Sequence, residues 1–148
     1  MSKLQKISFI GFILVALGLA TNGIIYLLAD KIMPYHLVAM GSSWENLPRG
    51  IQIMSLNFMQ SAGAGFLTTS IALLFLLWFP FRQGELWARW AILIIALNEI
   101  LLVTFRVIDV GTNTPAKPPF SLLIIIIAIT IISFILSFCN CKNKKTTQ

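Results

Sequence analysis

The sequence predicts an all-α fold, a polytopic membrane protein in which four transmembrane helices form one bundle. Of 148 residues, 57% are hydrophobic and only 11% are charged, whereas a soluble domain carries about 25% charged residues. The apolar residues gather in four runs separated by polar segments, and roughly 20 apolar residues in a helix cross the hydrocarbon layer. We therefore expect a single transmembrane domain over residues 1–148, with spans near 7–29, 51–79, 86–107 and 120–138.

The first run follows Lys3 and Lys6 and extends over residues 7–29. A secretory signal peptide is the alternative interpretation, because a basic start, an apolar segment and Gly18-Leu19-Ala20 resemble a cleavable leader. The apolar stretch continues past Ala20, so we favour a retained span.

Residues 30–50 form a long outer loop. Pro34 is expected to open a short helical turn there and Gly41 to end it. The second run would be about 44 Å long as a helix, so it is expected to tilt or to project from the membrane. Pro80 is predicted to end it, and residues 111–119, which contain three prolines, are predicted to connect the last two spans.

The basic residues predict the orientation of the spans. They lie at the ends of the apolar runs instead of on one face, which argues against a nucleic-acid partner despite the net charge of +6. The side with both termini carries seven basic residues, namely Lys3, Lys6, Arg82, Arg89, Lys142, Lys144 and Lys145. The other side carries four, namely Lys31, Arg49, Arg106 and Lys117. The positive-inside rule then predicts a multi-pass protein of the cell (inner or plasma) membrane with both termini and the basic tail, 139–148, in the cytoplasm.

Polar residues within the spans predict which helix faces look inward, because lipid-facing positions gain nothing from them. At 1.5 Å per residue, Asn22 lies about 10 Å and Glu99 about 12 Å below the outer ends of their helices. We expect a polar cluster in the outer half of the bundle, a candidate ligand-binding site made of Asn22, Asn57, Gln60, Asn98, Glu99 and Arg106. The fourth span has only hydroxyl residues, which can bond their own backbone, so it is predicted to be the most lipid-exposed helix.

Two interpretations of Glu99 remain open. An ionisable group at this depth is costly unless it is paired, protonated or hydrated, which makes it a functional candidate. Alternatively, Glu99 is neutral or paired with Arg106, and the amide side chains act as hydrogen bonds between helices.

The sequence lacks the motifs of familiar catalysis, including phosphate-binding loops, nucleophile elbows and haem attachment. His36 is the only histidine, and Cys139 and Cys141 are the only cysteines, so we expect no metal site, no cofactor and no catalytic residue. A membrane enzyme that uses Glu99 and His36 on a lipid or quinone is a third, separate hypothesis.

Two stretches of the sequence carry a family resemblance. The first is Met33-Pro-Tyr-His36 with Ser43-Trp-Glu-Asn-Leu-Pro48, and the second is Phe81-Arg-Gln-Gly-Glu-Leu-Trp-Ala-Arg-Trp90. Both resemble a family of small bacterial inner-membrane proteins of unknown function. The plan of four spans with a longer first outer loop is similar to the broad DoxX-like group. This resemblance implies the fold and the location, and no site residue is carried over from it.

The function we expect first is that of a noncatalytic or accessory bundle whose partners are the lipid bilayer, a second copy or other membrane proteins. The alternative is a small carrier or binding bundle that takes up a proton, a cation or a small amphipathic molecule through the cluster around Glu99.

Overall fold

A computed structural model describes residues 1–139. Five α-helices form, α1 (Lys3–Leu27), α2 (Pro34–Met40), α3 (Arg49–Leu76), α4 (Leu86–Asn113) and α5 (Phe120–Phe138), together with a 3-10 turn η1 (Trp44–Asn46) and a π-helical turn η2 (Leu77–Phe81). The described residues contain no β-strand, so the all-α prediction is confirmed. Four helical segments, α1, α3 with η2, α4 and α5, are long and apolar enough to cross a membrane, and they define a multi-pass membrane protein. The predicted basic tail lies outside the described residues except for Cys139.

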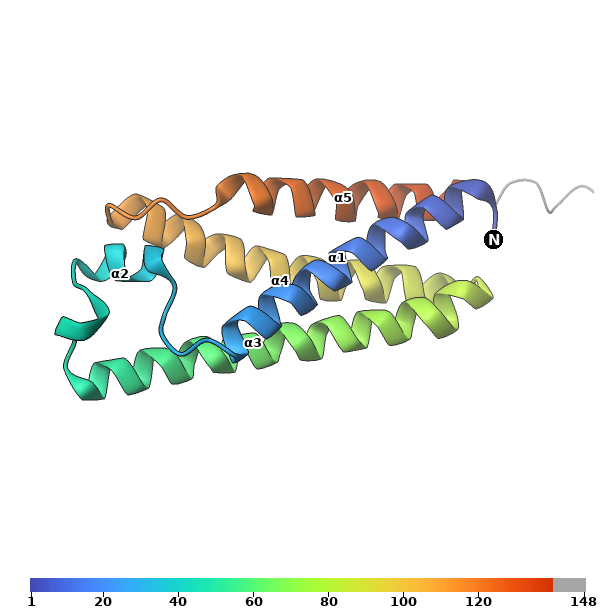
Figure 1. Ribbon diagram of the computed structural model, residues 1–148. Coiled ribbons are helices and arrows are strands. Elements are labelled where there is room, and N and C mark those ends of the chain that lie inside the picture. Colours follow the sequence, from blue (N-terminus) through green and yellow to red (C-terminus); the bar gives the residue numbers. More distant parts are fainter. Residues whose placement is uncertain (140–148) are drawn as a thin grey trace, which may run out of the picture.

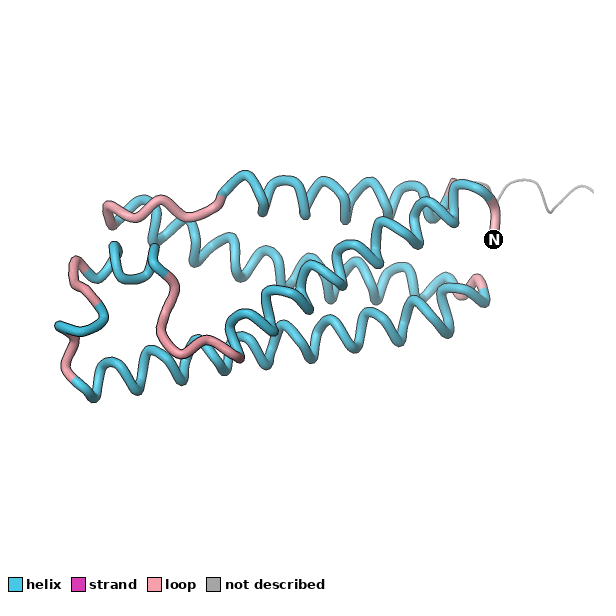
Figure 2. The backbone as a smooth tube through the Cα atoms, viewed as in Figure 1, coloured by secondary structure: helices cyan, strands magenta, loops and turns pink. Residues whose placement is uncertain are grey.

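The four long helices lie side by side in one bundle (Figure 1). α1 packs most extensively on α3 and also on α5, while α4 packs on α5 and α3. The N-terminus, the loop at residues 82–85 and the end of α5 lie at one end, which we call the terminal end (Figure 2). The connections at residues 28–48 and 114–119 lie at the other end, which we call the loop end.

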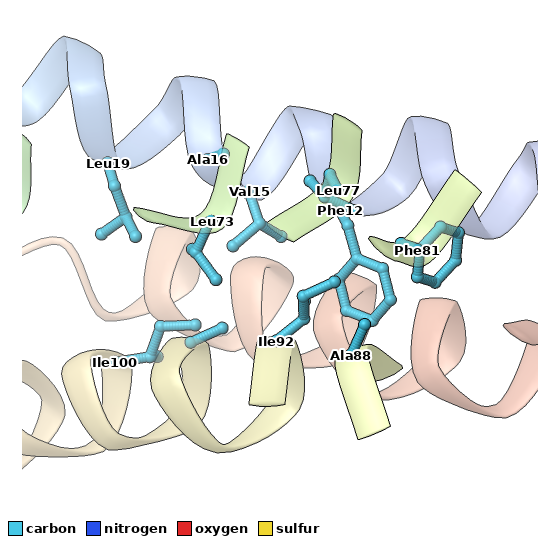
Figure 3. Packing of buried hydrophobic residues seen from close by; sticks show 11 residues of the cluster. Phe12, Val15, Ala16, Leu19, Leu73, Leu77, Phe81, Ala88, Ile92 and Ile100 are labelled. Atoms are coloured by element: carbon cyan, nitrogen blue, oxygen red, sulfur yellow. The ribbon is translucent and has the colours of Figure 1, made fainter. Parts of the chain in front are cut away.

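The hydrophobic core fills the space between α1, α3 with η2, and α4 (Figure 3). Its buried members are Phe12, Val15, Ala16, Leu19, Leu73, Leu77, Phe81, Ala88, Ile92, Ala96 and Ile100. α5 contributes partly buried residues to this cluster, among them Ile127 and Phe134. In a bilayer such packing replaces contacts with lipid, so close fit rather than hydrophobicity stabilises it.

Small residues bring the helix backbones together at two places. A Cβ added to Gly23 of α1 would lie 2.8 Å from the carbonyl oxygen of Gly63 on α3. A Cβ added to Gly11 would overlap the Ser133 hydroxyl on α5. Close approach of this kind is typical of membrane helix pairs.

Buried hydroxyl groups add hydrogen bonds between the helices. Ser70 Oγ donates to the carbonyl of Ala16 at 2.8 Å, and Ser8 Oγ donates to the carbonyl of Ser133 at 2.6 Å. Both bonds satisfy a hydroxyl group away from water.

Several helix limits differ from the predicted ones, and three of the differences have a local cause. α1 begins at Lys3 because Ser2 and Gln5 form a reciprocal capping box. α4 continues six residues past Val107 to Asn113, and its Gly111 allows the Phe120 ring of α5 to pack closely. Pro80 does not end the second span, because it lies inside the π-helical turn η2 that continues α3. The wider turn accommodates the proline ring and its missing N–H group. Pro34 and Gly41 do begin and end α2 as predicted, with Gly41 at a φ of 65°.

The prediction for the fourth span needs a correction. Thr130 and Ser137 bond their own helix as expected, but together with Ser133 they are buried. In the most apolar 18-residue stretch of each helix, the share of buried residues is 17% for both α5 and α4. α5 is therefore no more exposed to lipid than α4, because its hydroxyl face packs on α1 through Ser8 and Gly11.

Candidate functional site

A pocket of about 340 Å³ lies at the loop end, between α1, α4 and α5 and beneath the start of α2. Its wall is mostly aliphatic and aromatic and includes no charged residue. The lining residues are Leu19, Asn22, Ile25, Tyr26, Met33, Pro34, Tyr35, Phe66, Ile100, Val103, Val107, Pro119, Leu122, Leu123 and Ile126.

The pocket follows from how α1 crosses the bundle. At the terminal end Gly11 holds α1 against Ser133 of α5, and at the loop end Gly23 holds it against Gly63 of α3. α1 thus leans away from α5 toward the loop end (Figure 1). The space that opens between these two helices is the pocket.

The rim of the pocket opens sideways. Ile25 of α1 and Leu122 of α5 both line it, yet they are 48% and 46% exposed. Both positions belong to helices long and apolar enough to span a membrane. The pocket wall therefore reaches the outer surface of the bundle at α1 and at α5.

Three polar side chains line this apolar pocket. The hydroxyl groups of Tyr26 and Tyr35 are hydrogen-bonded at 2.9 Å, which ties α2 to the end of α1. The Asn22 amide donates to the carbonyl of Gly18 on its own helix at 2.9 Å. The rings of Tyr35 and His36 meet edge to face, with centroids 4.1 Å apart.

Tyr35 and His36 of α2 are neutral near pH 7. Burial, and then the hydrogen bond and proximity of Tyr26, raise the pKa of Tyr35 far above its ordinary value. Burial lowers the pKa of His36. An uncharged apolar wall with phenol groups at one end suits a neutral amphipathic ligand and disfavours an ion.

The structure distributes the predicted cluster over separate surroundings. Asn22 lines the pocket. Gln60 Nε2 donates to the carbonyl of Ala29 at 3.1 Å and so fastens α3 to the end of α1. Asn57 is exposed and lines a second, polar hollow together with Asp30 and Arg49.

The α4 members of the predicted cluster do not join Asn22. Glu99 is half-buried and accepts a hydrogen bond from Thr69 Oγ1 of α3 at 3.2 Å. The exposed guanidinium of Arg106 lies 5.5 Å from the ring centroid of Phe105, and within residues 1–139 no ion pair joins it to Glu99. Asn98 is exposed on the outside of α4.

Sequence reasoning missed Tyr35 as a wall of the pocket. Tyr26 follows Asn22 by four residues, so both share a helix face, but nothing in the sequence shows that Tyr35 folds back onto Tyr26. His36 is not part of the pocket wall, but its ring lies beside the Tyr26 ring at a centroid distance of 6.5 Å. Glu99 bonds Thr69 instead and does not line the pocket.

Within the described residues, no three His, Cys, Asp or Glu side chains gather in a way that could hold a metal ion. The class defined by this fold is a multi-pass α-helical membrane bundle with a lateral apolar pocket. No protein-family model, curated protein or solved structure matches the chain. The resemblance to the DoxX-like group stays a prediction.

Proposed function

We propose that this protein is a noncatalytic membrane bundle that binds one neutral amphipathic molecule, with the hydrocarbon tail in the pocket and a hydroxyl or carbonyl head at Tyr26 and Tyr35. The observation that carries the proposal is the uncharged pocket, open to the side between α1 and α5. Small-molecule sites occupy roughly 300 to 1,000 Å³. The pocket volume of about 340 Å³ lies at the low end of that range, which favours one chain over a whole two-chain phospholipid.

The head group follows from the groups at the mouth. A phenol both donates and accepts a hydrogen bond, so the Tyr26 and Tyr35 pair can accommodate an alcohol or a carbonyl group. A charged head would lose water without gaining a partner charge, which is unfavourable. With the orientation predicted by the basic residues, both termini are cytoplasmic and the pocket draws its ligand from the outer leaflet of the cell membrane.

Uptake of a proton or cation through Glu99 has less support, because Glu99 bonds Thr69 between α3 and α4 and lies outside the pocket wall. The enzymatic hypothesis has less support too. Glu99 and His36 have different partners, Thr69 for the first and the two tyrosine rings for the second.

The test uses hexadecanol that carries a photoactivatable diazirine on its chain. Irradiation of the protein in nanodiscs, followed by peptide mass spectrometry, is expected to label residues of the pocket wall on α1, α4 and α5. Excess unlabelled hexadecanol should suppress this labelling. Labelling that spreads over all lipid-facing positions and resists competition would overturn the proposal.

A matched pair of variants on α5 controls for general effects. Leu123 lines the pocket, and its neighbour Ile124 is 67% exposed on the lipid side. Leu123→Trp fills the pocket and is expected to reduce the competable labelling at least about fivefold, a loss of about 1 kcal/mol in binding free energy. Ile124→Trp should leave it unchanged. Equal effects of the two variants would contradict the assignment of the pocket.

A further inference from the structure

A lone carboxamide faces outward from the middle of α4. Asn98 is exposed, whereas Ala96 and Ile100 of the same helix are buried in the core. At 3.6 residues per turn, Asn98 points away from the side that these two residues occupy. The same outward stripe carries Ile94, Leu101 and Phe105, all exposed and apolar.

The Asn98 carboxamide has no hydrogen-bonding partner within residues 1–139, in contrast to the Asn22 carboxamide, which donates to the carbonyl of Gly18. At 1.5 Å per residue, it lies about 18 Å from Leu86 and about 10 Å from Phe105, the ends of the apolar part of α4. A side chain as short as asparagine cannot reach the interface from this depth. Hydrocarbon offers no donor or acceptor, so an amide left there is unfavourable until another polar group meets it.

A second copy of this chain would supply that group. All copies insert with the same orientation, so a two-fold axis along the membrane normal places identical residues at the same depth. A carboxamide carries both donors and an acceptor, and two Asn98 side chains across such an axis satisfy each other reciprocally. A different partner would need its own polar group at this depth.

The apolar neighbours of Asn98 fit the same arrangement. Ile94, Leu101 and Ile108 are spaced by seven, as are Asn98 and Phe105, and all five residues are exposed. A seven-residue repeat of contact positions is the pattern of paired helices, in which a single buried asparagine fixes register and oligomeric state. We propose that two copies associate through this face of α4, with the Asn98 carboxamides hydrogen-bonded to each other.

The proposal does not depend on the pocket, and disulfide trapping in membranes tests it. On a background with Cys139→Ser and Cys141→Ser, Leu101→Cys is expected to give an oxidant-dependent covalent dimer. Ile125 of α5 is as exposed as Leu101, at 54%, but lies on a helix outside the proposed interface. Ile125→Cys should therefore give no covalent dimer. Absence of a dimer at Leu101→Cys, or equal yields at the two positions, overturns the proposal.

Variants of Asn98 test the hydrogen bond itself. Asn98→Leu should reduce the yield of the Leu101→Cys dimer at least about fivefold, while the thermal stability of the monomer is kept or raised. Asn98→Gln retains the amide and should preserve the dimer. Thr68 is an exposed polar residue of α3 whose hydroxyl donates to the carbonyl of Ala64 on its own helix. Thr68→Leu should therefore leave the yield of the Leu101→Cys dimer unchanged. Trapping that is unchanged by Asn98→Leu overturns the role of the amide.

Discussion

Gly23 of α1 and Gly63 of α3 meet backbone to backbone, so that a Cβ on either residue would lie 2.8 Å from the carbonyl oxygen of the other. The contact is reciprocal and lies beside the Tyr26 side chain, whose Cβ is also 2.8 Å from an added Cβ on Gly63. It fixes where α1 leaves α5 and therefore where the pocket opens. The two glycines connect helix packing to the proposed function.

Gly63→Ala is expected to lower stability by about 1 to 3 kcal/mol, because an added methyl group at a close backbone contact forces the helices apart. The melting temperature of the protein in detergent measures this effect. Gly65→Ala on the same helix is the control, since nothing lies within 4 Å of its added Cβ. If both variants melt alike, the close crossing of α1 and α3 is wrong.

The Thr69 and Glu99 pair predicts an energetic coupling between α3 and α4. Hydrogen bonds between membrane helices average about 0.6 kcal/mol, with a maximum of about 1.7 kcal/mol. A double-mutant cycle with Thr69→Val and Glu99→Gln should show a coupling in this range, while hexadecanol labelling of the pocket persists in Glu99→Gln. Thr104→Val serves as the control because its hydroxyl bonds its own helix at Ile100.

Additive effects of Thr69→Val and Glu99→Gln would show that the two side chains do not interact. Loss of pocket labelling in Glu99→Gln, with the melting temperature unchanged, would instead favour a ligand site at Glu99. The two measurements thus separate the structural interpretation of Glu99 from the functional one.

The packing of α2 against the end of α1, which we call docking, is expected to depend on pH through His36. Burial lowers the pKa of His36 in the docked state, so the undocked state binds a proton more readily. Docking therefore weakens as the pH falls below the ordinary histidine value of about 6.5, and it reaches its weakest level at the lowered pKa. At high pH the raised pKa of Tyr35 has the mirror effect, because the undocked phenol ionises first, near pH 10.

Amide hydrogen exchange of residues 34–40, corrected for intrinsic rates, measures this docking. Exchange should be faster at pH 5 than at pH 7.5, and His36→Phe should remove the difference. Because His36 is the only histidine, no other imidazole can produce it. Equal corrected exchange at both pH values would show that the imidazole is not buried by docking.

Local sequence signals predicted the helices well. Long apolar runs give spans because every backbone polar group must be bonded within lipid, and the fourth predicted span coincides with α5 at Phe120–Phe138. The predicted ends of the helices were wrong where the local backbone compensated for an unfavourable residue. At Pro80, for example, a π-helical turn tolerates the proline. Thr112 and Asn113, bonded to Asp109, extend α4 beyond its apolar part.

The candidate site was harder to predict because it depends on how the helices cross. Periodicity placed Asn22 on the side of α1 that lines the pocket, but it failed on α3, where Asn57 is exposed. The rotation of α4 cannot be read from its own sequence. Glu99 and Asn98 are adjacent and so point about 100° apart, and only the packing decides which one faces α3. The same packing brings Tyr35 of α2 to the pocket, where it contacts Tyr26 of α1. No sequence periodicity links these two segments, so their contact could not be predicted.

Orientation in the membrane is the last prediction, and it decides which leaflet the pocket faces. On a background without native cysteines, Ser42→Cys reports the loop end and Gln83→Cys reports the terminal end, both lying outside the four apolar helices. A membrane-impermeant maleimide applied to intact cells is expected to label Ser42→Cys at once and Gln83→Cys only after permeabilisation, because basic loops are retained in the cytoplasm. Immediate labelling of Gln83→Cys with protection of Ser42→Cys would invert the orientation and place the pocket in the cytoplasmic leaflet. That result would leave the pocket chemistry intact and change only the source of its ligand.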